Sequence, residues 1–321
     1  MKNYNINIEN YLKSGFYIGS CEINNNKIQY LRELILKNLK NSNKEKIMTF
    51  VDFNEEVRSE IINLLSSNFI KNFLKELKFR LKTDVSVLPK IHVMKNYHVN
   101  RLKTAGIGWH RDCAGEFRHP HCNNLLSKNE YVFGKIGIYL QENSEALGGG
   151  IDLIPKSHYF IKNKNYFKRK FSGIRLKILH IIQKKFPSLY KLISENSYIK
   201  FLKALKIKAN PGDPVFFDSR VIHRGSPIKD DMVNNFAELD NIHYQVPDKD
   251  AKISIYCEYG SSVGVESTLY DRGTREEYAE ELEMWLKEIE LYKKYSPELH
   301  SLALDIIHNA NLDKLKKQQS N

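Results

Sequence analysis

The first third of the chain has apolar residues at the spacing of α-helices. Between Lys27 and Leu39 they recur every three or four residues, which predicts an amphipathic helix. The same pattern runs from Glu55 to Leu81, directly after Asn54, a residue type that caps helix N-termini. We therefore predict one helix in each stretch.

From Ile91 onward the pattern changes to that of β-strands. Short runs of β-branched and aromatic residues are separated by Gly, Pro, Asn and Asp, which favour turns. The runs are IHVMKNYHV, TAGIGWHRD, KIGIYLQE, GGIDLIPKSH, DPVFFDSRVIH and AKISIYCEY. This pattern predicts a sheet-rich core over residues 91–260.

A helical pattern returns at Gly273. Thr274 and Glu277 have the spacing of a capping box, and apolar residues follow at helical intervals. The chain is therefore expected to be one α+β domain over residues 1–321. Its expected parts are an N-terminal helical part (1–90), the core (91–260), an insertion in that core (162–208) and a C-terminal helical part (261–321).

Composition narrows the class of protein. With 321 residues, 41% hydrophobic and 27% charged, the chain is typical of globular proteins. The four cysteines are scattered, which does not indicate a disulfide framework. The N-terminus lacks the apolar stretch of a secretory signal, so we expect a cytoplasmic protein, and the sequence leaves its oligomeric state unknown.

The net charge of +12 is concentrated in one segment. Residues 162–208, called here the basic segment, contain 14 Lys or Arg and a single acid, Glu195. Its aliphatic residues alternate with lysines at helical spacing, for example in GIRLKILHIIQKKF and YIKFLKALKIK. The rest of the chain is close to neutral.

His110 and Asp112 form a pair with metal-binding character. On an extended strand, residues two apart point the same way. Two imidazoles and one carboxylate on one face of a divalent metal leave its other positions open, as in non-haem Fe(II) oxygenases. We predict that His223, at the end of the run DPVFFDSRVIH, supplies the second imidazole. A His-x-Asp pair alone is a weak signal, and ordinary polar residues at strand ends are the alternative.

Three motifs in fixed order strengthen this interpretation. GWHRD, YLQENSEALGGGIDLIPKSH and NPGDPVFFDSRVIHRGSP together resemble the phytanoyl-CoA dioxygenase family of Fe(II)/2-oxoglutarate oxygenases over about residues 91–260. The resemblance implies a double-stranded β-helix, that is, a jelly-roll barrel of the cupin type. It also implies that His110, Asp112 and His223 bind Fe(II), with 2-oxoglutarate as co-substrate and O2 as oxidant. Halogenating relatives replace the carboxylate, so Asp112 favours hydroxylation.

The family's usual arginine partner for the distal carboxylate of 2-oxoglutarate is missing. The strand AKISIYCEY contains Lys252 and no arginine. A lysine forms the same charge-assisted bond as a point cation, so we expect Lys252 to take this role, with a solvated lysine at a strand end as the alternative. Tyr97 is a second candidate, with a buried structural aromatic as its alternative. Arg224 follows His223 directly and is expected to face away.

A cluster of cysteines and histidines follows His110 and Asp112 in the sequence. The stretch CAGEFRHPHC contains Cys113, His119, His121 and Cys122, but its spacing matches no standard zinc module. We favour a loop over the mouth of the barrel.

The basic segment leaves several interpretations open. Basic amphipathic helices bind anionic membrane surfaces, whereas a helical cap on the barrel would have the same pattern. Nucleic acid is less favoured, because aliphatic residues are more prominent in the segment than the stacking aromatics and phosphate-binding arginines of nucleic-acid channels. The expected function is hydroxylation of an anionic or lipid-linked small molecule or glycan, with succinate and CO2 as co-products, in a cytoplasmic protein that associates peripherally with membranes. The alternatives are an inactive jelly-roll binding module and an iron-dependent nucleic-acid dealkylase.

Overall fold

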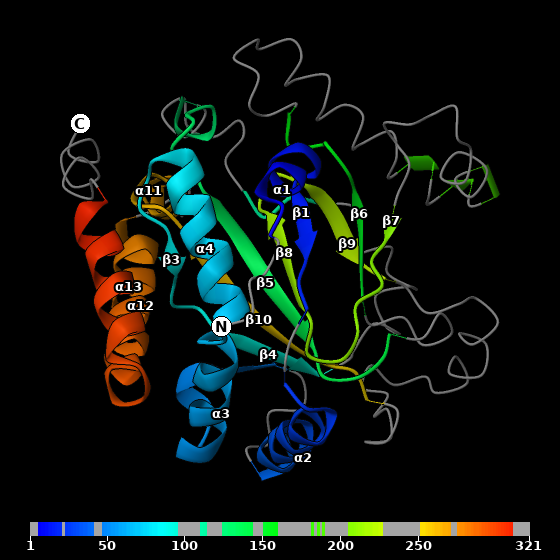
Figure 1. The fold of residues 1–321 in the computed structure, drawn as a ribbon, viewed down its shortest axis with the longest axis vertical. Helices are drawn as coiled ribbons and strands as arrows, with labels where there is room; N and C mark the ends of the chain where they lie inside the picture. Colours follow the sequence, from blue (N-terminus) through cyan, green and yellow to red (C-terminus); the bar gives the residue numbers. More distant parts are fainter. Residues whose placement is uncertain are drawn as a thin grey trace.

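The structure is a computed structural model with two antiparallel sheets and flanking helices, which confirms the predicted mixture of helix and sheet. It describes residues 6–20, 23–41, 47–95, 110–113, 124–143, 150–159, 181–182, 185–186, 188–189, 205–226, 251–270 and 275–310. The small sheet and the helices lie on opposite sides of the large sheet (Figure 1).

The large sheet has seven strands in the order β1-β8-β5-β10-β4-β2, and β3 also pairs with β10. Its strands are β1 (Phe16–Ile18), β2 (Ile47–Thr49), β3 (Ser86–Val87), β4 (His92–Lys95), β5 (Phe133–Tyr139), β8 (Pro214–Asp218) and β10 (Ile253–Gly260). The small sheet has the order β7-β6-β9, with β6 (Ile151–Ile154), β7 (Leu205–Lys206) and β9 (Ile222–Gly225). His110 extends it through an isolated bridge to His223.

The chain alternates between the two sheets. From β4 it passes to the small sheet at His110, back to β5, across to β6 and β7, back to β8, across to β9 and finally to β10. Side chains such as Tyr139, Leu153 and Phe217 meet between the sheets in a buried cluster. The space between the two sheets is therefore a packed apolar interior.

Helices cover the outer face of the large sheet. The N-terminal helices are α1 (Ile8–Ser14), α2 (Asn25–Asn41), α3 (Glu55–Leu65) and α4 (Asn68–Leu81). Phe73 of α4 stacks on Phe216 of β8, with ring centroids 3.8 Å apart. The opposite faces of β8 and β10 are thus left to line the interior.

The helix predicted over Lys27–Leu39 is confirmed by α2, but the single helix predicted over Glu55–Leu81 is wrong. Asn54 caps α3 as expected, because its side chain accepts from the Val57 N–H. The chain then leaves the helical conformation at Ser66 and Ser67, which cap α3 and α4. Serine at two successive positions favours caps over helix interiors, so the apolar stripe continues across a break.

The run DPVFFDSRVIH also differs from the prediction of one strand. It forms β8 and β9, which belong to different sheets and are joined by a tight turn. The Val221 N–H donates to the Asp218 carbonyl oxygen, and the Asp218 side chain accepts from the Arg220 N–H. This turn moves His223 from the large sheet to the small one.

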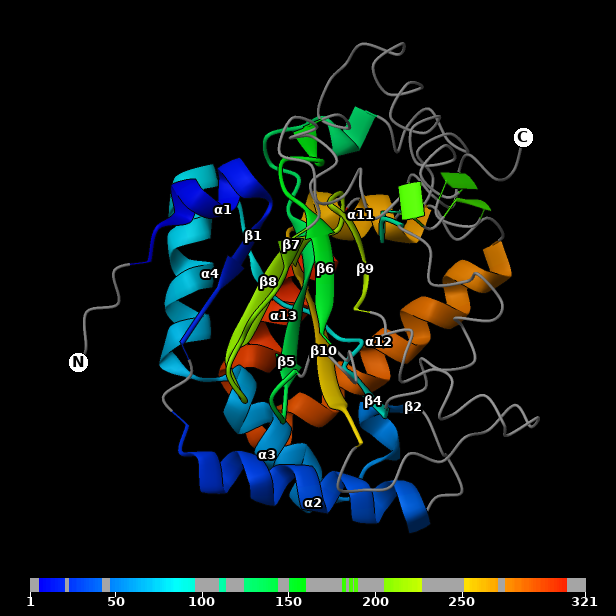
Figure 2. The same ribbon diagram turned by 90° about the vertical axis from the view of Figure 1, so that its right-hand side faces the viewer.

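The C-terminal part is helical, as expected. It contains α11 (Ser262–Tyr270), α12 (Arg275–Tyr295) and α13 (Pro297–Asn309), which lie behind the large sheet in Figure 2. Buried Glu288 of α12 accepts from the backbone N–H groups of Lys90 and Ile91, and burial raises its pKa to about 7. This contact fixes α12 against the start of β4. The proposed capping residue Thr274 lies outside the described residues.

Most of the basic segment falls outside the described residues. Its described residues 181–182, 185 and 188–189 are helical, as predicted, and the Phe186 N–H donates to the Ile182 carbonyl oxygen at 2.8 Å. Its described end contradicts the helical pattern, because Leu205–Lys206 is strand β7, paired with β6. Among the described residues, no helix is long and apolar enough to cross a bilayer.

Candidate metal centre

His110, Asp112 and His223 come together where the small sheet faces the large one. The backbones of His110 and His223 exchange two hydrogen bonds of 2.9 Å, and the Asp112 N–H donates to the Ser219 carbonyl oxygen at 3.0 Å. Main-chain bonds therefore place all three residues, and the side chains need only point inward.

The three side chains form one compact set of ligand atoms. One atom from each lies within 4.8 Å of the others. Asp112 Oδ2 is 3.4 Å from His223 Nε2, and Asp112 Oδ1 is 3.7 Å from His110 Nε2. The His110 side chain is 53% exposed and that of His223 is 7% exposed, so the set opens toward solvent on the His110 side.

Hydrogen bonding and nearby charges give His223 and Asp112 the protonation states that bind a metal cation. His223 Nδ1 lies 3.0 Å from the Val221 carbonyl oxygen, so Nδ1 carries the proton and the Nε2 lone pair faces Asp112. Burial lowers the pKa of His223 to about 4. Burial opposes ionisation of Asp112, but attraction by His223 and Lys135 outweighs it and holds the pKa of Asp112 below its usual range. A neutral imidazole and an ionised carboxylate are the forms that bind metals.

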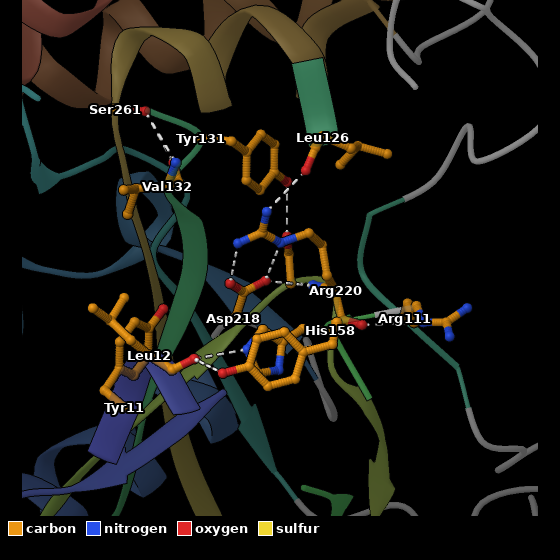
Figure 3. Close-up of polar contacts among 12 residues, drawn as sticks. Tyr11, Leu12, Arg111, Leu126, Tyr131, Val132, His158, Asp218, Arg220 and Ser261 are labelled. Atoms are coloured by element: carbon orange, nitrogen blue, oxygen red, sulfur yellow. Dashed lines mark hydrogen bonds and ion pairs between the residues drawn. The ribbon is translucent and has the colours of Figure 1, made fainter. Parts of the chain in front are cut away.

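A buried ion pair between Asp218 and Arg220 supports the turn that holds Asp112 (Figure 3). Arg220 donates to both Asp218 carboxylate oxygens, at 2.8 and 2.5 Å, and to the Leu126 carbonyl oxygen at 2.9 Å. The guanidinium also lies 4.4 Å from the centroid of the Tyr131 ring. Ser219, between the two charged residues, is the residue whose carbonyl oxygen accepts from Asp112. Sequence reasoning missed this positioning pair.

The same turn also holds the residue between His110 and Asp112. Arg111 Nε donates to the Arg220 carbonyl oxygen at 3.0 Å. Both Asp112 and Arg111 are thus bound to backbone oxygens of residues 219–220. Figure 3 also shows His158 directed at the Leu12 carbonyl oxygen, a contact of 2.9 Å.

Lys135 is a further residue at the site that sequence reasoning missed. It lies on β5 opposite Glu258 of β10, and its Nζ is 3.1 Å from Asp112 Oδ2. Burial disfavours the ammonium, but Asp112 and Glu258 more than compensate and raise the pKa of Lys135. The available signal was a lysine inside the apolar strand VFGKIGIYL, where an unpaired charge would be costly.

The structure does not bring Lys252 to the triad. Lys252 precedes β10 and lies six residues from Glu258, which at about 3.3 Å per residue is roughly 20 Å along the strand. Its Nζ donates to the Glu142 carbonyl oxygen at 2.8 Å, beside a cavity of about 570 Å³ bordered by α2. The expected role of Lys252 toward the distal carboxylate of 2-oxoglutarate stays a prediction, and its Nζ is bound to the Glu142 carbonyl oxygen in this structure.

The other predicted residues lie elsewhere or outside the described part. Arg224 pairs at 3.0 Å with Asp152, the residue opposite it on β6. Since neighbouring residues of a strand point to opposite faces, Arg224 points away from the face that carries His223, as expected. Tyr97 and the stretch CAGEFRHPHC beyond Cys113 lie outside the described residues.

No protein-family model and no curated protein matches this sequence. Solved structures with a similar arrangement include SnoN, a non-haem alpha-ketoglutarate-dependent epimerase from nogalamycin biosynthesis, with 11% identity, a TM-score of 0.42, and coverage of 78% of this chain and 79% of that one. The carbocyclase SnoK from the same biosynthesis has 11% identity, a TM-score of 0.45, and coverage of 80% and 85%. AviO1 from Streptomyces viridochromogenes has 12% identity, a TM-score of 0.44, and coverage of 79% and 93%. These similarities are distant.

Proposed function

We propose that this protein is an Fe(II)- and 2-oxoglutarate-dependent oxygenase that hydroxylates its substrate. The observation that supports this best is the convergence of His110, Asp112 and His223 between two antiparallel sheets. Two imidazoles and one carboxylate are the donor set of non-haem Fe(II) oxygenases. Successive strands that alternate between the sheets support a jelly-roll barrel, the double-stranded β-helix, as the fold around them.

The residues present fit such a metal. Asp112 Oδ2 is buried and accepts no hydrogen bond of good geometry from the described residues, although Lys135 and His223 lie near it. Lys135 balances the charge of this carboxylate, but no well-directed hydrogen bond from the part of the chain that the structure describes occupies Oδ2, so its lone pairs are available to a metal ion. His223 already presents its unprotonated Nε2 to the same point, so His110, Asp112 and His223 would hold the ion.

When bound, Fe(II) and 2-oxoglutarate would supply the activation of O2, with one oxygen atom entering the substrate as hydroxyl and the other entering succinate as CO2 is lost. The chain's own residues have simpler tasks. The exchange of backbone bonds between His110 and His223 fixes the distance between the imidazoles. The Asp218–Arg220 pair fixes the turn that binds Asp112. The buried interior around Tyr139 and Phe217 keeps water away from one side of the site.

The first test is turnover of 2-oxoglutarate by purified protein. We expect succinate to form slowly without substrate when Fe(II) and O2 are both present, and to be undetectable under nitrogen or with a chelator. Iron-loaded protein that releases no succinate with or without a panel of anionic substrates would support the inactive binding module instead. Stimulation of succinate release by alkylated oligonucleotides alone would support the dealkylase.

We also propose an anionic or lipid-linked substrate that the basic segment helps to present. Its described residues expose large apolar side chains next to a lysine: Ile181 is 53% exposed, Phe186 56% and Leu189 45%. Lys185 is exposed beside Phe186. Exposed apolar and basic groups together favour contact with an anionic membrane surface, where each basic residue contributes about 1 kcal/mol.

Co-sedimentation with lipid vesicles tests this proposal. We expect the protein to bind phosphatidylglycerol-containing vesicles at low salt and to bind neutral vesicles weakly. The double variant Lys185→Glu, Phe186→Ser should bind at least about fivefold less, since it loses one basic and one apolar contact. Lys293→Glu, an exposed lysine of α12, serves as a control with the same charge change and should bind as the wild type does. Binding that ignores lipid charge, or a double variant that binds normally, would contradict a membrane role.

A further inference from the structure

The interior face of the large sheet carries a buried cation next to the metal ligands. Lys135 lies in the middle of β5, between Phe217 of β8 and Glu258 of β10. Its neighbours Gly134 and Ile136 belong to the opposite face, and Ile136 packs in the core under the helices. The side chain of Lys135 is therefore directed between the sheets, where it reaches Asp112 at 3.1 Å.

The contacts of Lys135 leave it available to a further anion once a metal is bound. Asp112 is its closest carboxylate, and a metal ion bound to Asp112 would neutralise the charge that Lys135 now balances. Glu258 is shared with Lys90, whose Nζ lies 3.8 Å away and also contacts Glu281 at 2.8 Å. A divalent metal with Lys135 and Asp112 carries a net charge of about +2, which a dianionic ligand would neutralise.

Polar groups continue from Lys135 along the interior face of β5. The next residue on the same face is Gly137, and a Cβ at that position would lie 3.1 Å from the Tyr256 ring. The Tyr139 and Tyr256 hydroxyls beyond it are 3.4 Å apart. The Tyr256 ring therefore packs closely on the Gly137 backbone, and the two tyrosine hydroxyls add polar groups to the interior face beyond Lys135.

On the basis of the proposed function, we propose that Lys135 binds the distal carboxylate of 2-oxoglutarate, the role first expected of Lys252. Lys135 lies beside the triad, whereas Lys252 lies about 20 Å along the strand from Glu258. A lysine provides a point charge that binds a carboxylate from several directions. The residue that selects the co-substrate is thus on β5, and not on the last strand.

The test compares 2-oxoglutarate with 2-oxopentanoate, which has a methyl group in place of the distal carboxylate. Binding to the Fe(II)-loaded protein is measured without oxygen, by calorimetry and by the charge-transfer absorption of the iron chelate. We expect the wild type to prefer 2-oxoglutarate by roughly 10- to 150-fold, the range for a hydrogen bond to a charged group. Lys135→Met should lose most of this preference while its affinity for 2-oxopentanoate changes less than about threefold. Lys135→Arg should keep part of the preference.

Lys252→Met is the matched control and should keep the wild-type preference. A Lys135→Met protein that still prefers 2-oxoglutarate as the wild type does would overturn the proposal, and so would one that binds both acids equally weakly because it has lost Fe(II). The second result would make Lys135 a positioning residue for Asp112. If wild-type protein loaded with Fe(II) binds neither acid, the proposed function itself fails. Thermal unfolding of each variant shows that it is folded, and Lys135→Gln replaces Lys135→Met if the latter is not.

Discussion

Replacing His223 with alanine lowers the affinity of the protein for Fe(II) by on the order of 100-fold or more. Loss of a partner that only orients a metal ligand already costs 10- to 100-fold, and His223 presents its Nε2 directly to the other two ligands. Asp112→Asn and His110→Ala are expected to have effects of the same order. Anaerobic competition with a chromogenic chelator measures the affinity, and succinate release should fall with it.

His308→Ala is the control for this series. His308 is an exposed histidine of α13, so its removal should leave both Fe(II) affinity and turnover unchanged. If His223→Ala and Asp112→Asn bind Fe(II) as tightly as the wild type, the metal centre is elsewhere and the proposed function loses its main support. Thermal unfolding without metal shows whether each variant is folded.

Replacing Arg220 with methionine lowers the free energy of unfolding by about 3 to 5 kcal/mol. The substitution leaves the Asp218 carboxylate buried without its guanidinium partner, and a buried charge that has lost its partner is strongly destabilising. The turn that binds Asp112 should loosen as well, so Fe(II) affinity should fall in the folded protein. Urea unfolding followed by circular dichroism measures the first effect.

Two variants sharpen this experiment. Arg80→Met removes an arginine whose pairing with Glu9 is exposed, so it should change the free energy of unfolding by less than about 1 kcal/mol. The double variant Asp218→Asn, Arg220→Met should lose less than the sum of the single losses, because no buried charge is left behind. Additive losses would show that the two side chains do not act as a pair.

The sequence predicted the periodic elements better than their ends. The apolar stripe of Glu55–Leu81 is real, but periodicity carries no information about a break such as that at Ser66 and Ser67, where α3 ends and α4 begins. The run DPVFFDSRVIH continues in apolar residues on both sides of its centre, yet the local Asp218–Arg220 pair bends it into two strands of different sheets. Asp218 and Ser219 are turn-forming residue types, so a turn signal was present in the sequence, but it did not show that the two halves belong to different sheets.

At the candidate site, too, the sequence predicted the residues that belong to motifs and missed those that strand pairing brings in. The three candidate metal ligands could be predicted because residue type, spacing and motif order all indicated His110, Asp112 and His223. For Lys252 the sequence indicated only its place at the start of a strand, and a local pattern does not say which end of that strand lies closer to the metal ligands. Lys135 was overlooked because its importance comes from strand pairing, which sets it opposite Glu258 and beside Asp112.

The bridge between His110 and His223 makes the two imidazoles neighbours in space at opposite ends of a long loop. A metal held by both would act as a removable cross-link that closes residues 111–222, including the whole basic segment. Closing a loop restricts the unfolded chain and not the folded one, so its benefit appears only when the metal is bound. The stability of the folded protein would then rise with the iron supply, and metal-free chains would unfold at a lower temperature than iron-loaded ones.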